Sequence, residues 1–450
     1  MEPQKKIDKV YSKESNWRLY TMEKLVSGVL FEKELMEEIR EKFAYVDMDP
    51  ITKKKRLFLD NAGGSFRLKK ANERFAELDL MPDHPMREHE TAVYLSEIEQ
   101  KGIEDVRTIF NANQGSIAPY YTASQAMFAL TGVIAENIEG TNIVTTELEH
   151  PSAYDAAKFY ADKLDKEFRV AKTNPVTGGV GVEEITKLID QDTILLSVIY
   201  ASNISGAILD IETIVKEARK IKPDLYIIVD AVQHAPHGLI DIEKTPVDAM
   251  NFAPYKFFGV RGSGFAYISD RAAKLPHQRL LGKEDGDLQL GSSTPGHYAS
   301  ISAVVDYVCW IGSKFTDARD RRTLYEEGIN RIALHERALL EAILNGTENV
   351  KGLRDMPEVI VHLDDEDLSK RDFIIGITLE GIEYKEAVVL YGEENVTVYD
   401  RVASSIYSKR MLESFDMEGA IRVTPLHCNT IEEIELFLEV TQKIVTNNAK

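Results

Sequence analysis

The sequence predicts an α/β protein whose large domain is built on a mostly parallel, doubly wound sheet, followed by a smaller α+β domain. Between about residues 100 and 310, short apolar segments alternate with segments of helical periodicity, which is the pattern of βαβ units. Beyond residue 314 the pattern changes to a long polar helix and then to a mixed region. With 450 residues the chain is long enough for two domains.

The predicted elements follow one another in order. Residues 14 to about 50 place apolar side chains three and four positions apart, which predicts helix, and residues 57–60 predict a short strand before a glycine-containing turn. Further helices are expected at residues 95–109, 124–136, 152–165, 182–190 and 211–220, and strands at NIVTTE, FRVAKT, TILLSVIY, LYIIVDA, AMNFAP and GFAYIS. We expect residues 1–50 to form a helical segment that packs with the small domain, 51–313 the large domain, and 314–450 the small domain.

Composition excludes some classes of function. The chain has 54 Lys and Arg residues against 74 Asp and Glu residues, a net charge of −20, which argues against nucleic acid or an anionic membrane as partner. The first twenty residues lack the apolar core of a signal peptide, and no apolar stretch is long enough to span a membrane. The two cysteines, Cys309 and Cys428, form no framework of disulfides or zinc ligands, and no metal site is expected. These features predict a cytoplasmic protein.

Three predicted strands end in polar residues. These are Asn203, Asp230 and Lys256, which are separated by 27 and 26 residues, about one strand–helix unit each. Because ligands bind at the carboxyl ends of the strands in an open α/β sheet, all three side chains are expected to face one crevice. Lys256 is flanked by aromatic residues, a setting that lowers the pKa of an amine and favours its use as a nucleophile. The alternative is a strand-end lysine that reaches solvent.

Six segments resemble those of a known family. NFAPYKFFGVRGSGFAYIS is similar to the lysine motif of the class V aminotransferase superfamily, in its cysteine desulfurase and selenocysteine lyase-like group of fold type I enzymes that use pyridoxal 5'-phosphate (PLP). Five further segments resemble other motifs of this family and occur in the correct order, from about residue 55 to 445. They are LFLDNAGGS, TTELEHPSAYDA, SVIYASNISGAILDI, IIVDAVQHAPH and AIRVTPLHCNTIEEIELFL.

The resemblance implies three catalytic residues. Lys256 would hold PLP as a Schiff base and then move protons at the substrate Cα. Asp230 would face the pyridine nitrogen and keep it protonated, which makes the ring an electron sink. His150 would stack on the ring face. The alternative role for Asp230 is to cap a helix. The alternative role for His150 is a position at the N-terminus of the helix that follows it, without contact to a cofactor.

The resemblance also implies binding residues and a homodimer with shared active sites. Ala123 and Ser124 would open the helix that binds the phosphate, although Ser124 has N-capping as an alternative or additional role. Arg422 would bind the substrate α-carboxylate, a task suited to a bidentate donor, unless it is a surface arginine. Asn203 and Gln233 would lie near the ring oxygen, Tyr255 at the phosphate and Asn61 at the substrate. Ser293 and Thr294 would reach the neighbouring subunit's phosphate, and the alternative is that they form a simple turn.

One departure from the family limits the reaction. Desulfurases of the family accept sulfur on a loop cysteine, but the corresponding stretch TVYDRVASSIYSKRMLES contains none, and neither Cys309 nor Cys428 matches that position. The sequence therefore predicts a lyase that cleaves a C–S or C–Se bond of an α-amino acid by β-elimination. An aminotransferase, an epimerase, a desulfurase with an external thiol acceptor, and a non-catalytic PLP-binding scaffold are the alternatives.

Overall fold

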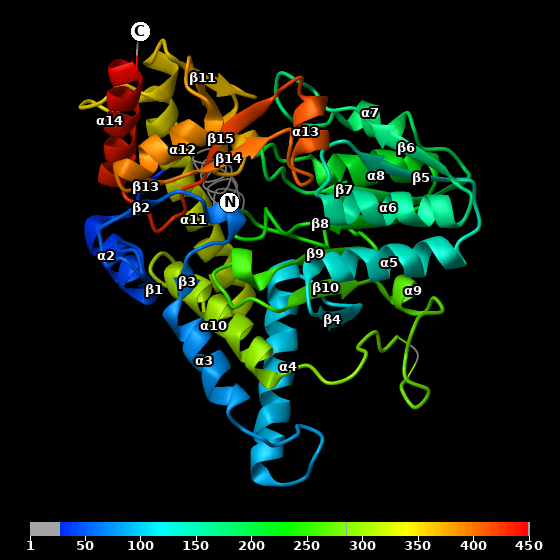
Figure 1. The fold of residues 1–450 in the computed structure, drawn as a ribbon. Coiled ribbons are helices and arrows are strands. Elements are labelled where there is room, and N and C mark those ends of the chain that lie inside the picture. Colours follow the sequence, from blue (N-terminus) through cyan, green and yellow to red (C-terminus); the bar gives the residue numbers. More distant parts are fainter. Residues whose placement is uncertain (1–27, 285, 449–450) are drawn as a thin grey trace, which may run out of the picture.

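The computed structural model describes residues 28–284 and 286–448, and its elements are labelled in Figure 1. The part of the predicted N-terminal helix before residue 28 lies outside these residues. Within them, helix α2 (Lys33–Lys42) buries Met36 and Ile39 in the main core and joins the C-terminal helix through an ion pair of Arg40 with Glu433, at 2.9 Å.

The large domain is organised by a mixed sheet with the strand order β4-β10-β9-β8-β7-β5-β6. Strands β6, β5, β7, β8 and β9 run parallel, whereas β10 and β4 add an antiparallel edge. Five of the six strands expected in this region are therefore parallel, and the sixth, GFAYIS, reverses direction. Edge strand β4 contains a proline and was not predicted from its sequence. The bounds are β4 (Ser116–Tyr120), β5 (Asn142–Thr146), β6 (Glu167–Ala171), β7 (Thr193–Ile199), β8 (Tyr226–Asp230), β9 (Ala249–Phe252) and β10 (Gly264–Ile268).

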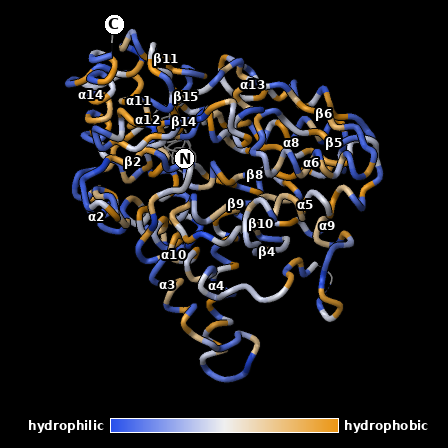
Figure 2. Tube along the Cα trace, in the orientation of Figure 1, coloured by the Kyte–Doolittle hydropathy of each residue, from blue (hydrophilic) through white to orange (hydrophobic). Residues whose placement is uncertain are grey.

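Helices cover both faces of this sheet (Figure 1). Successive residues of a strand point to opposite faces, so Leu195 packs with α5 and α6 while Leu196 packs with the core on the other side. The inner strands β5, β7, β9 and β10 are therefore buried along their whole length, whereas the edge strands β4 and β6 are only partly buried. Figure 2 shows hydrophobic residues alternating with hydrophilic ones along the whole chain. The helices of this domain are α3 (Lys69–Asp79), α4 (Glu90–Phe110), α5 (Ala123–Asn137), α6 (Pro151–Lys163), α7 (Val182–Thr186), α8 (Ile211–Ile221), α9 (Asp270–Ala273) and α10 (Pro295–Gly312).

The C-terminal region forms a second core around a four-stranded antiparallel sheet of order β11-β12-β15-β14. Its strands are β11 (Val359–His362), β12 (Ile375–Leu379), β14 (Tyr399–Val402) and β15 (Gly419–Val423), and its helices are α11 (Arg321–Asn345), α12 (Tyr384–Glu393), α13 (Lys409–Ser414) and α14 (Ile431–Asn448).

The predicted strand at residues 57–60 lies with this C-terminal core. Strand β2 (Leu57–Phe58) pairs in parallel with β13 (Val396–Thr397), and Leu57 and Leu59 are buried among C-terminal residues. Short strands β1 (Phe43–Ala44) and β3 (Arg67–Leu68) pair with each other next to it. The chain thus contributes to both cores before it enters the large sheet, and the predicted domain boundaries remain a prediction.

Three predictions of helical bounds need correction. The helix expected to run to about residue 50 ends at Lys42 in α2, and strand β1 follows it directly. The helix expected at 182–190 ends at Thr186 in α7, and the long polar helix expected near 314 begins only at Arg321, after α10 has ended at Gly312. No helix of residues 28–284 and 286–448 is long and apolar enough to cross a membrane.

Candidate active site

The polar ends of β7, β8 and β9 meet in one pocket of about 280 Å³ at the carboxyl edge of the parallel strands. Helix α5 and the turn before α6 complete its walls. The predicted residues that line it are Ala123, Ser124, His150, Asn203, Asp230, Gln233, Tyr255 and Lys256. Eight of the predicted side chains, from five separate segments, are thus brought together.

Lys256 ends a short 3-10 turn (Pro254–Lys256) that follows β9. Its side chain is buried, and its Nζ donates a hydrogen bond to Gln233 Oε1 at 3.3 Å. Burial, together with the positive charge of Arg422, lowers the pKa of Lys256 to about 8. A larger fraction of this amine is therefore unprotonated near neutral pH than for an exposed lysine, which is what nucleophilic attack requires.

Asp230 and Asn203 present buried oxygens to the pocket. Asp230 Oδ1 accepts a hydrogen bond from the Val232 amide at 3.0 Å, and burial raises the pKa of this carboxyl. Asn203 Oδ1 is buried and has no partner among the described residues. Because buried polar atoms are usually paired, this oxygen is available to a bound ligand.

His150 has the helix-terminal role considered for it and also lines the pocket, while its stacking on a cofactor ring remains a prediction. Its Nδ1 accepts a hydrogen bond from the Ser152 amide at 3.2 Å and so caps α6, while its ring lines the pocket. Burial and the charges of Lys256, Arg401 and Arg410 lower the pKa of His150 to about 3. The imidazole is therefore neutral at physiological pH, which suits contact with an aromatic ring.

The N-terminus of α5 opens into the pocket beside the turn that follows Lys256. Thr122, and not Ser124, is its N-cap, because Thr122 Oγ1 accepts the Gln125 amide at 3.0 Å. This corrects the alternative reading of Ser124. Strand β10 approaches closely here: a Cβ added to Gly264 would lie 2.7 Å from the Ala123 nitrogen, so only glycine fits without a shift.

Arg422 extends from β15 toward the same pocket. Its Nη1 donates to the backbone oxygen of Asn203 at 3.1 Å, and its Nη2 donates to Asp60 Oδ1 at 2.6 Å. The guanidinium is buried, so the surface reading considered for this residue is wrong.

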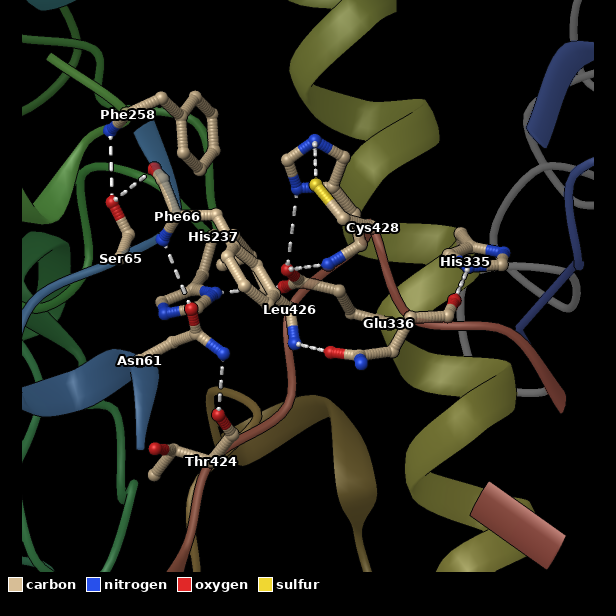
Figure 3. Close-up of polar contacts among 12 residues, drawn as sticks. Asn61, Ser65, Phe66, His237, Phe258, His335, Glu336, Thr424, Leu426 and Cys428 are labelled. Carbon is tan, nitrogen blue, oxygen red and sulfur yellow. Dashed lines mark hydrogen bonds and ion pairs between the residues drawn. The ribbon is translucent and has the colours of Figure 1, made fainter. Parts of the chain in front are cut away.

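The amide of Asn61, expected at the substrate, is engaged by the backbone. Its Nδ2 donates to the Thr424 oxygen at 3.0 Å and its Oδ1 accepts from the Phe66 amide at 3.1 Å (Figure 3). Asn61 therefore ties the N-terminal loop to the strand that bears Arg422, and any contact with a substrate remains a prediction.

Ser293 and Thr294 are not in the pocket of Lys256 in the same chain. They line a second pocket of about 550 Å³ beside α5 and the loop that precedes α10. The two pockets share Tyr121, Gly262 and Ser263, and are therefore contiguous.

Sequence reasoning missed several charged residues at this site. Glu149 is buried next to His150, and burial raises its pKa to about 8. Arg410 donates to the backbone oxygens of Glu147 and Glu149 and so holds the turn that carries His150. Arg261 lies over the Tyr255 ring at 4.5 Å. Arg401 and Arg410 lie in the stretch TVYDRVASSIYSKRMLES, where no motif in the sequence marks either arginine as a site residue.

Both cysteines lie away from the pocket lining and are buried. Burial raises the pKa of Cys309 to about 11, and burial also raises the pKa of Cys428. Thiols in this state are poor nucleophiles.

The fold and the pocket define an enzyme of the doubly wound α/β type with its site at the strand ends. A profile of the aminotransferase class-V family matches residues 57–437, and the chain belongs to this family. The predicted family is confirmed, and with it the class of PLP-dependent enzyme.

Curated relatives and solved structures agree with this assignment. A probable cysteine desulfurase of Borreliella burgdorferi is 27% identical over 67% of this chain and 70% of its own length. The cysteine desulfurase IscS of Buchnera aphidicola is 28% identical over 47% of this chain and 48% of its own length, so about half of that relative is spanned. Apo cysteine desulfurase from Thermococcus onnurineus NA1 has a TM-score of 0.75 at 19% identity, covering 91% of this chain and 98% of that one. CsdA from Escherichia coli has a TM-score of 0.75 at 15% identity, covering 93% and 100%. These structures confirm the predicted fold.

The pocket residues fit PLP. A buried amine with a lowered pKa is available for covalent attachment, and Asn203 Oδ1 and Ser263 Oγ are buried polar atoms without partners among the described residues. The N-terminus of α5 offers amides of the kind that bind phosphate. PLP, when bound, supplies an electron sink that stabilises negative charge at a substrate Cα.

Proposed function

We propose that this chain is a PLP-dependent lyase that cleaves a C–S or C–Se bond of a small α-amino acid. The observation that supports the proposal best is the position of Lys256, a buried amine of lowered pKa in one pocket with Asp230 and His150. In this reaction Lys256 binds the cofactor and then moves the proton at Cα, Asp230 holds the ring nitrogen, and the neutral His150 covers the ring face.

The remaining predicted residues complete the assignment. Arg422 binds the substrate α-carboxylate, and Asn61 supports it from the adjoining loop. Asn203 and Gln233 bind the ring oxygen, while Ala123, Ser124 and Tyr255 bind the phosphate. Elimination by this set needs no protein thiol, because the β-substituent leaves with its bonding electrons. A desulfurase reaction would instead pass sulfur to an external acceptor, since the chain has only the two buried cysteines.

We infer that the protein is a cytoplasmic homodimer, in which Ser293 and Thr294 reach the phosphate of the neighbouring site. The support is that the second pocket, which these residues line, adjoins the pocket of Lys256 at Tyr121, Gly262 and Ser263. The absence of a disulfide framework supports the cytoplasm.

The test begins with the cofactor. Purified protein loaded with PLP is expected to show visible absorbance, which Lys256→Ala removes and the matched surface variant Lys274→Ala retains. Amino acids are then screened for sulfide or selenide, pyruvate, alanine and keto acids.

Pyruvate formed with sulfide or selenide supports elimination, and alanine formed with sulfide supports desulfuration. A keto acid formed together with an aminated cofactor identifies an aminotransferase, and exchange of the Cα proton without cleavage identifies an epimerase. If PLP binds but none of these products forms, the protein is a binding scaffold and the proposed reaction is wrong.

A further inference from the structure

Two arginines extend from one face of the small-domain sheet. In the antiparallel pairing of β14 with β15, Tyr399 lies opposite Arg422 and Arg401 lies opposite Ala420. Because alternate residues of a strand share a face, Arg401 and Arg422 are diagonal neighbours on the same face, with Cα atoms about 7–8 Å apart. The opposite face carries Ile421, which is packed in the small-domain core.

This face of the sheet is turned toward the candidate active site. Arg422 donates to the backbone oxygen of Asn203, which lines the pocket. The positive charge of Arg401 adds to burial in lowering the pKa values of both Lys256 and His150, so its guanidinium acts on the same pocket. Arg422 and its diagonal neighbour Arg401 therefore lie on the face of the small-domain sheet that contacts Asn203, next to the residues that line the pocket.

Arg401 differs from Arg422 in forming no ion pair with a described residue, although Asp60 and Asp400 are near enough to act on its charge. Arg422 is paired with Asp60 at 2.6 Å. Arg401 is only 8% exposed and its Nη2 donates to the Tyr407 backbone oxygen at 2.8 Å, while its Nε is buried without a partner and it forms no ion pair with another described residue. Burial and the nearby Arg422 lower the pKa of Arg401 to about 10.

A buried arginine without an ion-paired carboxylate costs free energy of folding, because its charge has lost water and gained no direct contact with an anion. Such a group at the edge of a reaction pocket is typical of a ligand-binding residue. Its planar guanidinium is suited to a bidentate contact with a carboxylate or another oxyanion.

We propose that Arg401 is a second anion-binding residue of the substrate site, which selects α-amino acids whose side chain ends in a carboxylate or another oxyanion. The inference rests on the proposed function, because it assigns the α-carboxylate to Arg422. An anionic side chain gains an ion pair with Arg401 that a neutral side chain cannot form, and this difference in binding free energy discriminates between them.

The test measures binding of unreactive carboxylates to the PLP-loaded protein by calorimetry. Succinate has two anionic ends, whereas butyrate has the same number of carbons and one anionic end. We expect succinate to bind at least about tenfold more tightly than butyrate, a difference of about 1.4 kcal/mol. Arg401→Gln is expected to remove this preference, and Arg401→Lys to retain part of it. Lys409→Gln, which removes an exposed charge on the adjoining α13, serves as the matched control.

Each outcome decides between roles for Arg401. Equal binding of succinate and butyrate by the unmodified protein would overturn the proposal. A loss of affinity for both ligands alike in Arg401→Gln would also overturn it, since Arg401 would then share the α-carboxylate with Arg422. Circular dichroism and PLP absorbance check that the variants fold. A preference for succinate without any C–S cleavage would refute the proposed reaction and leave the second anion site standing.

Discussion

The strongest prediction about stability concerns a buried ion pair that joins the two cores. Glu336 on α11 is 4% exposed; its Oε2 accepts from His237 Nδ1 at 2.7 Å and its Oε1 accepts from the His427 amide at 3.0 Å (Figure 3). His237 follows the strand that carries Asp230, and His427 follows the strand that carries Arg422. Glu336 therefore connects the two walls of the active site.

Glu336→Gln is expected to destabilise the protein by about 3 kcal/mol near pH 6. Burial by itself lowers the pKa of His237, but the charge of Glu336 and its hydrogen bond outweigh burial and raise this pKa from 6.5 to about 9. At about 1.4 kcal/mol per pKa unit, that rise corresponds to about 3 kcal/mol. It agrees with the cost of about 3–5 kcal/mol for removing one partner of a buried pair.

The sign of the pH dependence follows from the raised pKa. The folded state holds the His237 proton more tightly than the unfolded state does, so this stabilisation is lost as the pH rises from 6.5 through about 9. Burial raises the pKa of the Glu336 carboxyl, so the pair also weakens on the acid side, where that carboxyl takes up a proton. Urea unfolding followed by circular dichroism is therefore expected to show a large difference between the unmodified protein and Glu336→Gln near pH 6, which shrinks toward about pH 9.5.

Glu341→Gln on the same helix is the matched control, since Glu341 is exposed and no change in stability is expected. A difference for Glu336→Gln that stays constant across this pH range would refute the ion-pair reasoning. So would an equal loss in Glu341→Gln, because the effect would then reflect the helix rather than the buried pair.

Three further predictions concern the cofactor and the thiols. Gly264→Ala is expected to weaken PLP binding by at least about tenfold in an absorbance titration, because its Cβ would crowd the Ala123 nitrogen at 2.7 Å; an unchanged affinity would contradict the close approach. The rate of PLP uptake by the apoprotein is expected to rise with pH through about 8, where Lys256 loses its proton, and not near 10.5; stopped-flow absorbance measures it. Cys428→Ser is expected to leave C–S cleavage unchanged, because that thiol is buried with a raised pKa; loss of sulfide formation in a folded variant would assign it a role.

The sequence predicted those parts of the molecule that depend on local pattern. Apolar runs and helical periodicity identified the parallel strands and most helices, because each is a continuous segment whose burial its own residues determine. Polar residues at successive strand ends identified Asn203, Asp230 and Lys256 as neighbours, because the carboxyl ends of parallel strands meet at one edge of the sheet. Strand β4 and the early end of α7 were missed, since a proline-containing edge strand and a short helix have weak local patterns.

What the sequence did not reveal depends on contacts between distant segments. Arg401 and Arg422 are 21 positions apart, and only the antiparallel register of β14 with β15 places them on one face. Likewise, nothing local to Asn61 indicates that Thr424 and Phe66 occupy its amide. Tertiary pairing thus decides whether a polar residue is free for a ligand or is used by the backbone.

The position of the charged residues matters more for this site than the net charge of −20. That value describes the molecule as a whole and argues against polyanionic partners, yet Lys256 lines the pocket and Arg401 and Arg422 are buried near it. Coulombic interactions are stronger and less screened in such a setting than at the surface, so these three cations, partly offset by Asp230 and Asp60, act on a ligand in the site more strongly than the outer charge does. An acidic protein can therefore bind a phosphate and a carboxylate, and Arg401 provides capacity for one anion more.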